Sequence, residues 1–238
     1  MHVLTLKLAG VWQAWSDKPT GTVRITQDIP TKSGVIGMIA NAMGRDYTDS
    51  IADLTTLSMG IRVDQQGTKL TDFQMVAQRD KTDAKPKQTT LVHKDYLQDA
   101  KFLVFLEHES LDFLKEIQQS LLHPARPPYL GRRNCQPMSL VVDSLRENTT
   151  ISKELNRHAW VASKWYKKKQ QNTVNLKCYT EKPSNSDTIK MTYTSKDVPL
   201  TFDPRHKRYA YRTYYRIEDV KVSNAYASNT YTDYFDAF

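Results

Sequence analysis

Alternating hydrophobic patterns along the first 146 residues predict an α+β fold. Apolar residues at every second position predict strands, whereas apolar residues three or four positions apart predict helices. The predicted strands and helices follow one another as strand, helix, strand, long excursion, strand, helix, strand, at about 3–8, 33–43, 60–64, 65–100, 101–107, 110–122 and 138–142. This order is that of a split βαβ arrangement. We therefore expect a ferredoxin-like (RRM-like) domain, in which two helices cover one face of an antiparallel sheet.

The first strand alternates clearly. Leu4, Leu6 and Leu8 share one face, and Thr5 and Lys7 share the other, so the pattern predicts a half-buried strand. A turn at 9–15 follows, with two tryptophans and an amide, and then a polar loop at 16–28.

The stretch 30–39 predicts the start of the first helix. Thr31 or Ser33 suits the N-cap, and Gly44 suits the residue after the helix end. Two glycines leave the first turn without side chains, so its N–H groups and the adjacent Lys32 would suit a phosphate. The alternative is an ordinary capped core helix whose glycines permit tight packing.

Residues 65–100 are polar and mixed in charge, which predicts a long hairpin projecting from the body. Aromatic and imidazole rings at Phe73, His93 and Tyr96 are interleaved with cations. Such a finger would suit a single nucleic-acid strand, and a solvated hairpin is the alternative. The cations are Arg79, Lys81, Lys85, Lys87 and Lys94.

The helix at 110–122 is stopped by Pro124, and a glycine turn follows at 129–133 with the sequence Tyr-Leu-Gly-Arg-Arg. Guanidinium groups match phosphate oxygens, and the ring of Tyr129 can stack on a base. The alternative is a plain helix-to-strand connection whose arginines face solvent.

The composition changes beyond residue 147, which predicts two regions, 1–146 and 147–238. Residues 153–177 hold seven Lys or Arg against one acidic residue. Strands are predicted at 188–194 and 209–220, giving a small, mostly β, basic C-terminal region. The segment 202–209 is basic and aromatic and suits either RNA or an exposed strand. The tail at 224–238 is expected to be loose or docked on a partner.

The formal charge of +8 and pI of about 9.3 favour a polyanionic partner, either nucleic acid or an anionic membrane surface. Two cysteines without a CxxC pair, and no secretory leader, predict a reduced, cytoplasmic protein. The apolar runs are too short to span a bilayer, so no membrane insertion is expected.

Signatures of catalysis are poor. The six histidines lack the spacing of a zinc site, and Thr31 stands where a P-loop needs glycine. We therefore expect no metal and no cofactor. His93, Lys94 and Tyr96 lie close in sequence and leave a metal-independent ribonuclease open as the alternative.

Several motifs occur in an order that resembles the CasD family, a subunit of the type I-E CRISPR Cascade surveillance complex. The resemblance rests on residues 8–10, 13–15, 30–34, 95–97, 129–133, 198–199, 202–204 and 208–209, and so covers most of the chain.

The resemblance implies a non-catalytic subunit that binds the 5′ handle of the CRISPR RNA (crRNA). Such a subunit caps the backbone filament beside the large subunit and takes part in antiviral DNA targeting. Its expected partners are the crRNA, the backbone and large subunits and, indirectly, the target DNA. The family's relative in type I-C complexes is an endoribonuclease, which keeps processing of precursor crRNA as the alternative.

The resemblance also implies the site residues. Gln13 and Trp15 would shape the handle pocket, and a thumb at 65–100 would contact the guide. Lys94 stands where relatives often have arginine, which loses bidentate geometry. The remaining expected RNA-binding residues are Thr31, Lys32, Ser33, Tyr96, Tyr129, Gly131, Arg132 and Arg133.

Overall fold

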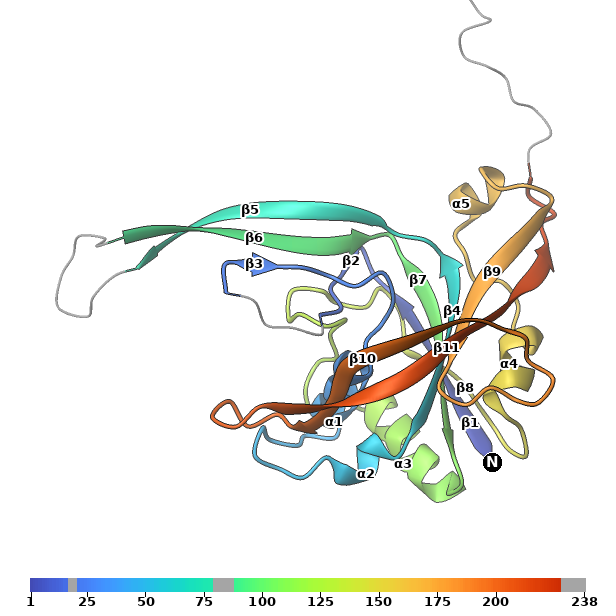
Figure 1. The fold of residues 1–238 in the computed structure, drawn as a ribbon, viewed down its shortest axis with the longest axis horizontal. Helices are drawn as coiled ribbons and strands as arrows, with labels where there is room; N and C mark the ends of the chain where they lie inside the picture. Colours follow the sequence, from blue (N-terminus) through green and yellow to red (C-terminus); the bar gives the residue numbers. More distant parts are fainter. Residues whose placement is uncertain (17–20, 79–87, 228–238) are drawn as a thin grey trace, which may run out of the picture.

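The computed structural model describes residues 1–16, 21–78 and 88–227. Expectations for 79–87, which include the cations Arg79, Lys81, Lys85 and Lys87, and for the tail beyond 227 lie outside the described residues. The main body contains a seven-stranded sheet in which every neighbouring pair is antiparallel (Figure 1). Its strands in spatial order are β10 (Ile189–Thr201), β11 (Arg208–Ser223), β9 (Thr173–Thr180), β4 (Ser58–Gln65), β7 (Lys101–His108), β1 (His2–Ala9) and β8 (Val142–Arg146).

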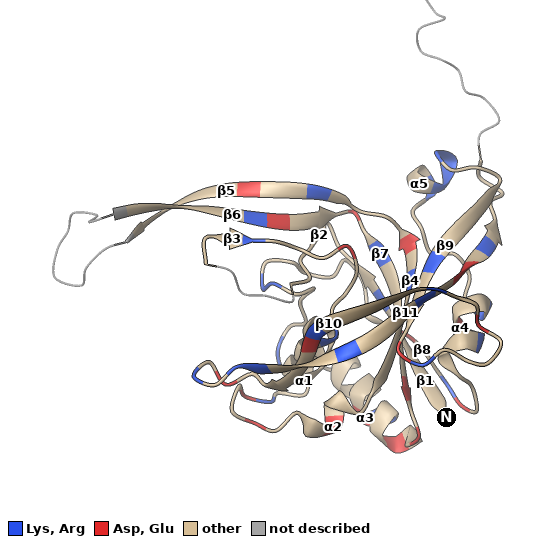
Figure 2. Cartoon of the chain, in the orientation of Figure 1, with Lys and Arg blue, Asp and Glu red and all other residues tan. Residues whose placement is uncertain are grey.

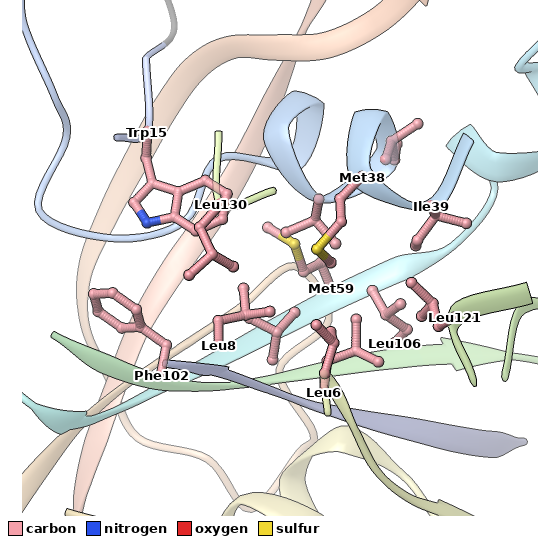
Figure 3. Close-up of a cluster of buried hydrophobic side chains, with 14 of the residues drawn as sticks. Leu6, Leu8, Trp15, Met38, Ile39, Met59, Phe102, Leu106, Leu121 and Leu130 are labelled. Atoms are coloured by element: carbon pink, nitrogen blue, oxygen red, sulfur yellow. The ribbon is translucent and has the colours of Figure 1, made fainter. Parts of the chain in front are cut away.

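Two helices cover one face of this sheet, as the hydrophobic patterns predict. Helix α1 (Lys32–Ala42) follows β1, and α3 (Leu111–Leu122) follows β7. Figure 3 shows Met38 of α1 facing Leu6 and Leu8 of β1, and all three side chains are fully buried. The structure thus confirms a mixed α/β fold built mostly from antiparallel strands.

Local sequence explains both helix starts. The Thr31 hydroxyl accepts the N–H of Gly34 at 3.3 Å, and the Ser110 hydroxyl accepts the N–H of Phe113 at 3.2 Å. Gly44 has φ of +79°, directly after the C-cap of α1, as expected for a residue that ends a helix.

The other face of the sheet is also covered, so the prediction of a half-buried first strand is wrong. Val3 and Thr5 of β1 are fully buried. They lie beneath α4 (Ile151–Arg157) and the segment around Trp160, which form a second core with Phe105 of β7. Because alternation along β1 cannot reveal what a distant segment covers, the sequence pattern underestimated burial there.

The predicted hairpin at 65–100 is confirmed. Strands β5 (Thr68–Gln78) and β6 (Gln88–Gln98) pair along their whole described length and extend away from the body (Figure 1). Two short strands pair with β6: β2 (Trp12–Gln13) near its base and β3 (Val23–Arg24) near its middle. We call this hairpin the thumb.

Three strand predictions need correction. Strand β8 begins at Val142 instead of 138, because Met138 and Leu140 are 70% and 67% exposed and their alternation marks no buried face. Strand β9 was missed, because its apolar positions lie within the basic run. The strand predicted at 188–194 runs on to Thr201 as β10 and contains Pro199, which is tolerated because β10 is an edge strand with a register shift.

The C-terminal region joins the rest through the sheet itself, since β9 pairs with β4. The boundary near residue 146 stays a prediction. Two further helices, α2 (Ala52–Thr55) and α5 (Lys164–Lys168), are short. Within the described ranges, no helix has the length and apolar character needed to cross a membrane.

Candidate nucleic-acid interface

A cleft of about 810 Å³ lies where the thumb, the start of α1, the loop at 129–134 and the tip of the β10–β11 hairpin meet. Figure 1 shows that the thumb and this hairpin extend toward the same side of the molecule. We call this site the basic cleft. Its lining residues are Ala14, Ser16, Arg24, Thr31, Ser33, Gly34, Gly37, Asn41, Tyr47, Lys94, Tyr96, Tyr129, Gly131, Arg132, Arg133, Asn134, Phe202, Lys207 and Tyr209.

Most of the expected RNA-binding residues line this single cleft, although they are spread over more than a hundred positions in sequence. Those that line it are Thr31, Ser33, Lys94, Tyr96, Tyr129, Gly131, Arg132 and Arg133. Gln13, Trp15 and Lys32 do not line it. The structure therefore brings together residues that the sequence could only list in order.

The cleft is strongly cationic. Its cations are Arg24, Lys94, Arg132, Arg133 and Lys207, and none of its described lining residues is an aspartate or glutamate. Five positive charges, with no carboxylate among the described lining residues, create a positive potential that a concave wall concentrates. Such a site attracts a polyanion.

The first turn of α1 forms part of the cleft wall, but its N–H groups are largely occupied. The Lys32 N–H donates to Asp197 Oδ2 at 2.8 Å, and the Gly34 N–H donates to the Thr31 hydroxyl. Gly34 also packs on the Trp15 ring, since a Cβ there would lie 2.8 Å from it. The expectation of a bare turn with free N–H groups is therefore wrong for these two positions.

Lys32 has a structural environment rather than a solvent-facing one. Its ammonium makes an ion pair with Glu181 at 2.8 Å, and the side chain is 7% exposed. Glu181 also accepts from Arg212, whose guanidinium binds Asp197 through two nitrogens. The Lys32 ammonium is therefore paired with a carboxylate and is not open to a phosphate as expected, because the C-terminal hairpin folds over the helix start.

Gln13 and Trp15 are both fully buried behind the cleft wall. Gln13 donates to the Ala100 carbonyl at 2.7 Å and accepts the indole N–H of Trp15 at 3.1 Å. In addition, the Trp15 backbone N–H donates to the Thr26 hydroxyl at 2.8 Å. These residues support the wall from inside, and their expected role in shaping a handle pocket stays a prediction.

In the loop at 129–134, position 131 requires glycine. Its φ is +88°, and a Cβ there would lie 1.7 Å from the Ala14 carbonyl oxygen. This close approach lets the loop lie against the segment after β2 and places the two following arginines at the cleft.

The two arginines of this loop differ in role. Arg132 donates to the backbone carbonyls of Asp95 at 2.9 Å and Arg24 at 2.8 Å, and its guanidinium lies 4.9 Å from the centre of the Tyr96 ring. It therefore ties the loop to the thumb. Arg133 is exposed and donates to the Tyr47 hydroxyl at 2.8 Å, so it is much freer to meet a ligand.

The two tyrosines differ in the same way. Tyr96 is 3% exposed, and its hydroxyl accepts from Asn134 at 3.0 Å, so its ring is not free to stack on a base. Tyr129 is half-buried, and burial raises the pKa of its phenol. Tyr129 is thus the better stacking candidate of the pair.

The grouping of His93 with Lys94 and Tyr96 is wrong. Residues 94 and 96 face the cleft, whereas His93 contacts Phe73 edge-on, with ring centres 5.1 Å apart, and does not line the cleft. Alternation along β6 separates neighbours in sequence onto opposite faces. Lys94 donates to Gln74 Oε1 at 2.5 Å.

Sequence reasoning missed Arg24, Asn41 and Tyr47 as cleft residues. Arg24 lies in a polar loop and Tyr47 follows a helix end, and neither position carries a pattern. Lys207 and Tyr209 had a signal in the basic and aromatic segment 202–209, and the structure places both in the cleft. In the part of the chain that is described, no group of three or more His, Cys, Asp or Glu suits a metal ion.

Comparisons with known proteins agree with this picture. Residues 3–215 match the family model described as CRISPR-associated protein (Cas_Cas5). The CRISPR system Cascade subunit CasD of Escherichia coli (strain K12) is 33% identical over 147 residues, covering 56% of this chain and 66% of that protein. The match thus spans slightly less than two thirds of that relative.

Two solved structures are similar over nearly the whole chain. One, titled CRISPR RNA-guided surveillance complex, has a TM-score of 0.73 and 29% identity, covering 98% of this chain and 96% of that one. A crystal structure of a Cas protein has a TM-score of 0.65 and 25% identity, covering 94% and 97%. With the family model matching most of the sequence, the chain belongs to the CRISPR-associated Cas5 family.

Proposed function

We propose that this chain is a subunit of a type I-E CRISPR RNA-guided surveillance complex and that its basic cleft binds the 5′ handle of the crRNA. The observation that carries the proposal is the convergence of five cations in one cleft whose described lining residues include no carboxylate. Phosphate oxygens are the ligands that such a lining prefers. The similarity to CasD and to a surveillance-complex structure supports the same role.

The proposal assigns the residues unequal parts. Arg24, Arg133 and Lys207 contact phosphates, because their side chains have no ion-pair partner among the described residues. Tyr129 stacks on a base at the rim. Gly131 and Arg132 hold the loop in place, and Thr31 and Ser33 contribute hydroxyls from the helix start.

The fold supports the wider role of the family. Strands β4, β7, β1 and β8 are adjacent in this order, with α1 and α3 on one face, which is the order of a ferredoxin-like unit. In the proposed complex this unit caps the backbone filament beside the large subunit, and the thumb contacts the guide. Target DNA is met only through the complex.

The test is a binding assay with a matched charge control. The cleft variant is Arg24→Gln with Arg133→Gln and Lys207→Gln. The control variant is Lys115→Gln with Lys153→Gln and Lys182→Gln, three exposed lysines that do not line the cleft. Each removes three positive charges, so a difference between them measures position rather than net charge.

For labelled handle RNA, the cleft variant should reduce the salt slope of binding by about 2, since each lost phosphate contact on a single strand contributes about 0.7. The control should change it by much less. Equal losses in both variants would refute the cleft as the binding site.

We propose further that the subunit binds without cutting. Incubation with labelled repeat RNA in EDTA, followed by paired native and denaturing gels, should give shifted and intact RNA. A discrete cleavage product would instead favour the metal-independent endoribonuclease, and tyrosines and lysines of the cleft would then be the first residues to change.

A further inference from the structure

A second group of cations lies on the face of the sheet opposite the basic cleft. It consists of Lys7, Lys101, Lys164, Lys167, Lys168 and Lys169, which we call the lysine face. Figure 2 shows the cations along α5, apart from those near the thumb and the C-terminal hairpin. None of these six residues lines the basic cleft.

Strand alternation places the first two lysines. Val3 of β1 and Leu103 of β7 belong to the second core. Lys7 is an even number of positions from Val3, and Lys101 is two positions from Leu103, so both lysines lie on the same face as that core, toward the thumb end of the sheet. The register opposes Lys7 to Leu103 and Ala9 to Lys101, which makes the two lysines diagonal neighbours. Their ammonium groups are therefore held on one surface by the two central strands.

Lys101 lies near enough to Lys7 and Lys167 for their charges to act on its ammonium. Burial lowers the pKa of Lys101, and the positive charges of Lys7 and Lys167 lower it further. The negative charge of Asp99 opposes this shift. Like charges thus gather on a half-buried surface, an arrangement that costs stability and that burial alone does not require.

Helix α5 is fixed against this surface by specific hydrogen bonds. The Asn224 amide donates to the carbonyls of Lys167 at 2.8 Å and Gln171 at 3.0 Å, and the Ser163 N–H donates to Gln65 Oε1 at 2.9 Å. The Lys167 ammonium itself donates to the Trp160 carbonyl at 2.7 Å.

A five-residue helix is not stable alone, and Lys164 and Lys168 repel one another at i, i+4. The contacts above hold four lysines in a fixed array despite that repulsion. Trp165 adds an exposed ring, 49% accessible, with the Lys169 ammonium 5.8 Å from its centre. Cations interleaved with an exposed aromatic ring suit a nucleic-acid strand.

We propose that the lysine face is a second nucleic-acid-binding surface, which takes the phosphate backbone of a strand running on the opposite side of the sheet from the basic cleft. It is independent of the cleft and of the handle-binding role proposed above. The shared ligand chemistry is a phosphodiester backbone, and the test distinguishes its source, RNA or duplex DNA.

The test uses the full chain with labelled single-stranded RNA and labelled duplex DNA as separate probes. The lysine-face variant is Lys164→Gln with Lys168→Gln and Lys169→Gln, and the control is again Lys115→Gln with Lys153→Gln and Lys182→Gln. The lysine-face and control substitutions are each also combined with the cleft substitutions. An error in the handle-binding proposal and an error in the lysine-face proposal then give different results.

We expect the lysine-face variant to reduce the salt slope by about 2 with RNA or by about 2.7 with duplex DNA, according to which probe binds there. The reduction should be the same with and without the cleft substitutions. Equal effects of the lysine-face and control variants, or no effect with either probe, would overturn the proposal.

Lys101→Gln gives a second readout that a purely structural lysine would not give. Because it relieves repulsion, it should leave the melting temperature unchanged or raise it, while it lowers affinity for the probe that binds the lysine face. A lower melting temperature together with unchanged affinity would contradict the proposal.

Discussion

Asp197→Ala should destabilise the protein strongly, because this carboxylate joins the C-terminal hairpin to the start of α1. Asp197 is 1% exposed and accepts from the Lys32 N–H at 2.8 Å, Arg212 Nε at 2.7 Å and Arg212 Nη2 at 2.8 Å. Removing it leaves three buried donors without their acceptor. Breaking a buried charge pair of this kind costs about 3–5 kcal/mol, a large part of the ~5–15 kcal/mol that stabilises a typical domain.

For a chain of this size, that loss corresponds to a fall in melting temperature of about 6–20 °C. Thermal and urea unfolding would measure it. Asp203→Ala is the matched control, because among the described residues that carboxylate binds the nearby, exposed Arg205 alone, so its loss should have little effect. An Asp197→Ala variant that melts within about 2 °C of the original chain would refute the reasoning about the buried network.

Three further predictions concern other parts of the fold. Gly131→Ala should lower both stability and RNA affinity, because φ of +88° and the Ala14 carbonyl exclude a Cβ; unchanged unfolding and binding curves would contradict this. Burial lowers the pKa of His158 below its usual 6.5, so the unfolded chain takes up the proton first and stability should fall as the pH drops below about 6.5. A urea midpoint equal at pH 7.5 and 5.5 would contradict this sign. Burial raises the pKa of Cys178 to about 12, so a thiol reagent should label it only after unfolding, and rapid native labelling would contradict its burial.

The sequence predicted helix ends and the thumb well, because these depend on residues that are close together along the chain. Thr31 and Gly44 mark the ends of α1 by backbone chemistry that needs no partner, and Ser110 does the same for α3. The thumb followed from its polarity and length. These predictions needed only neighbours along the chain.

Errors arose where a distant segment decides the outcome. In sequence Thr5 has the pattern of a solvent-facing strand residue, but α4 covers it. Lys32 likewise has no partner nearby in sequence, but its ammonium pairs with Glu181, which lies 149 positions away. Arg24 has no pattern at all and reaches the cleft only because β3 pairs with β6. Eight of the 19 described lining residues were nevertheless named from sequence motifs. The different roles of Arg132, which ties the loop to the thumb, and of the exposed Arg133 required the geometry.

The order in which the chain is synthesised gives the basic cleft one more property. Its walls include Arg24 from an early part of the chain and Lys207 and Tyr209 from a late part. The β10–β11 hairpin, which carries Lys207 and Tyr209, is held in place by the ion pair of Asp197 with Arg212. A nascent chain that has completed β8 already contains both arginines of the loop but lacks this last wall. The RNA capture that we propose for the complete cleft therefore requires a chain synthesised at least as far as Tyr209, and a shorter nascent chain offers only part of the site.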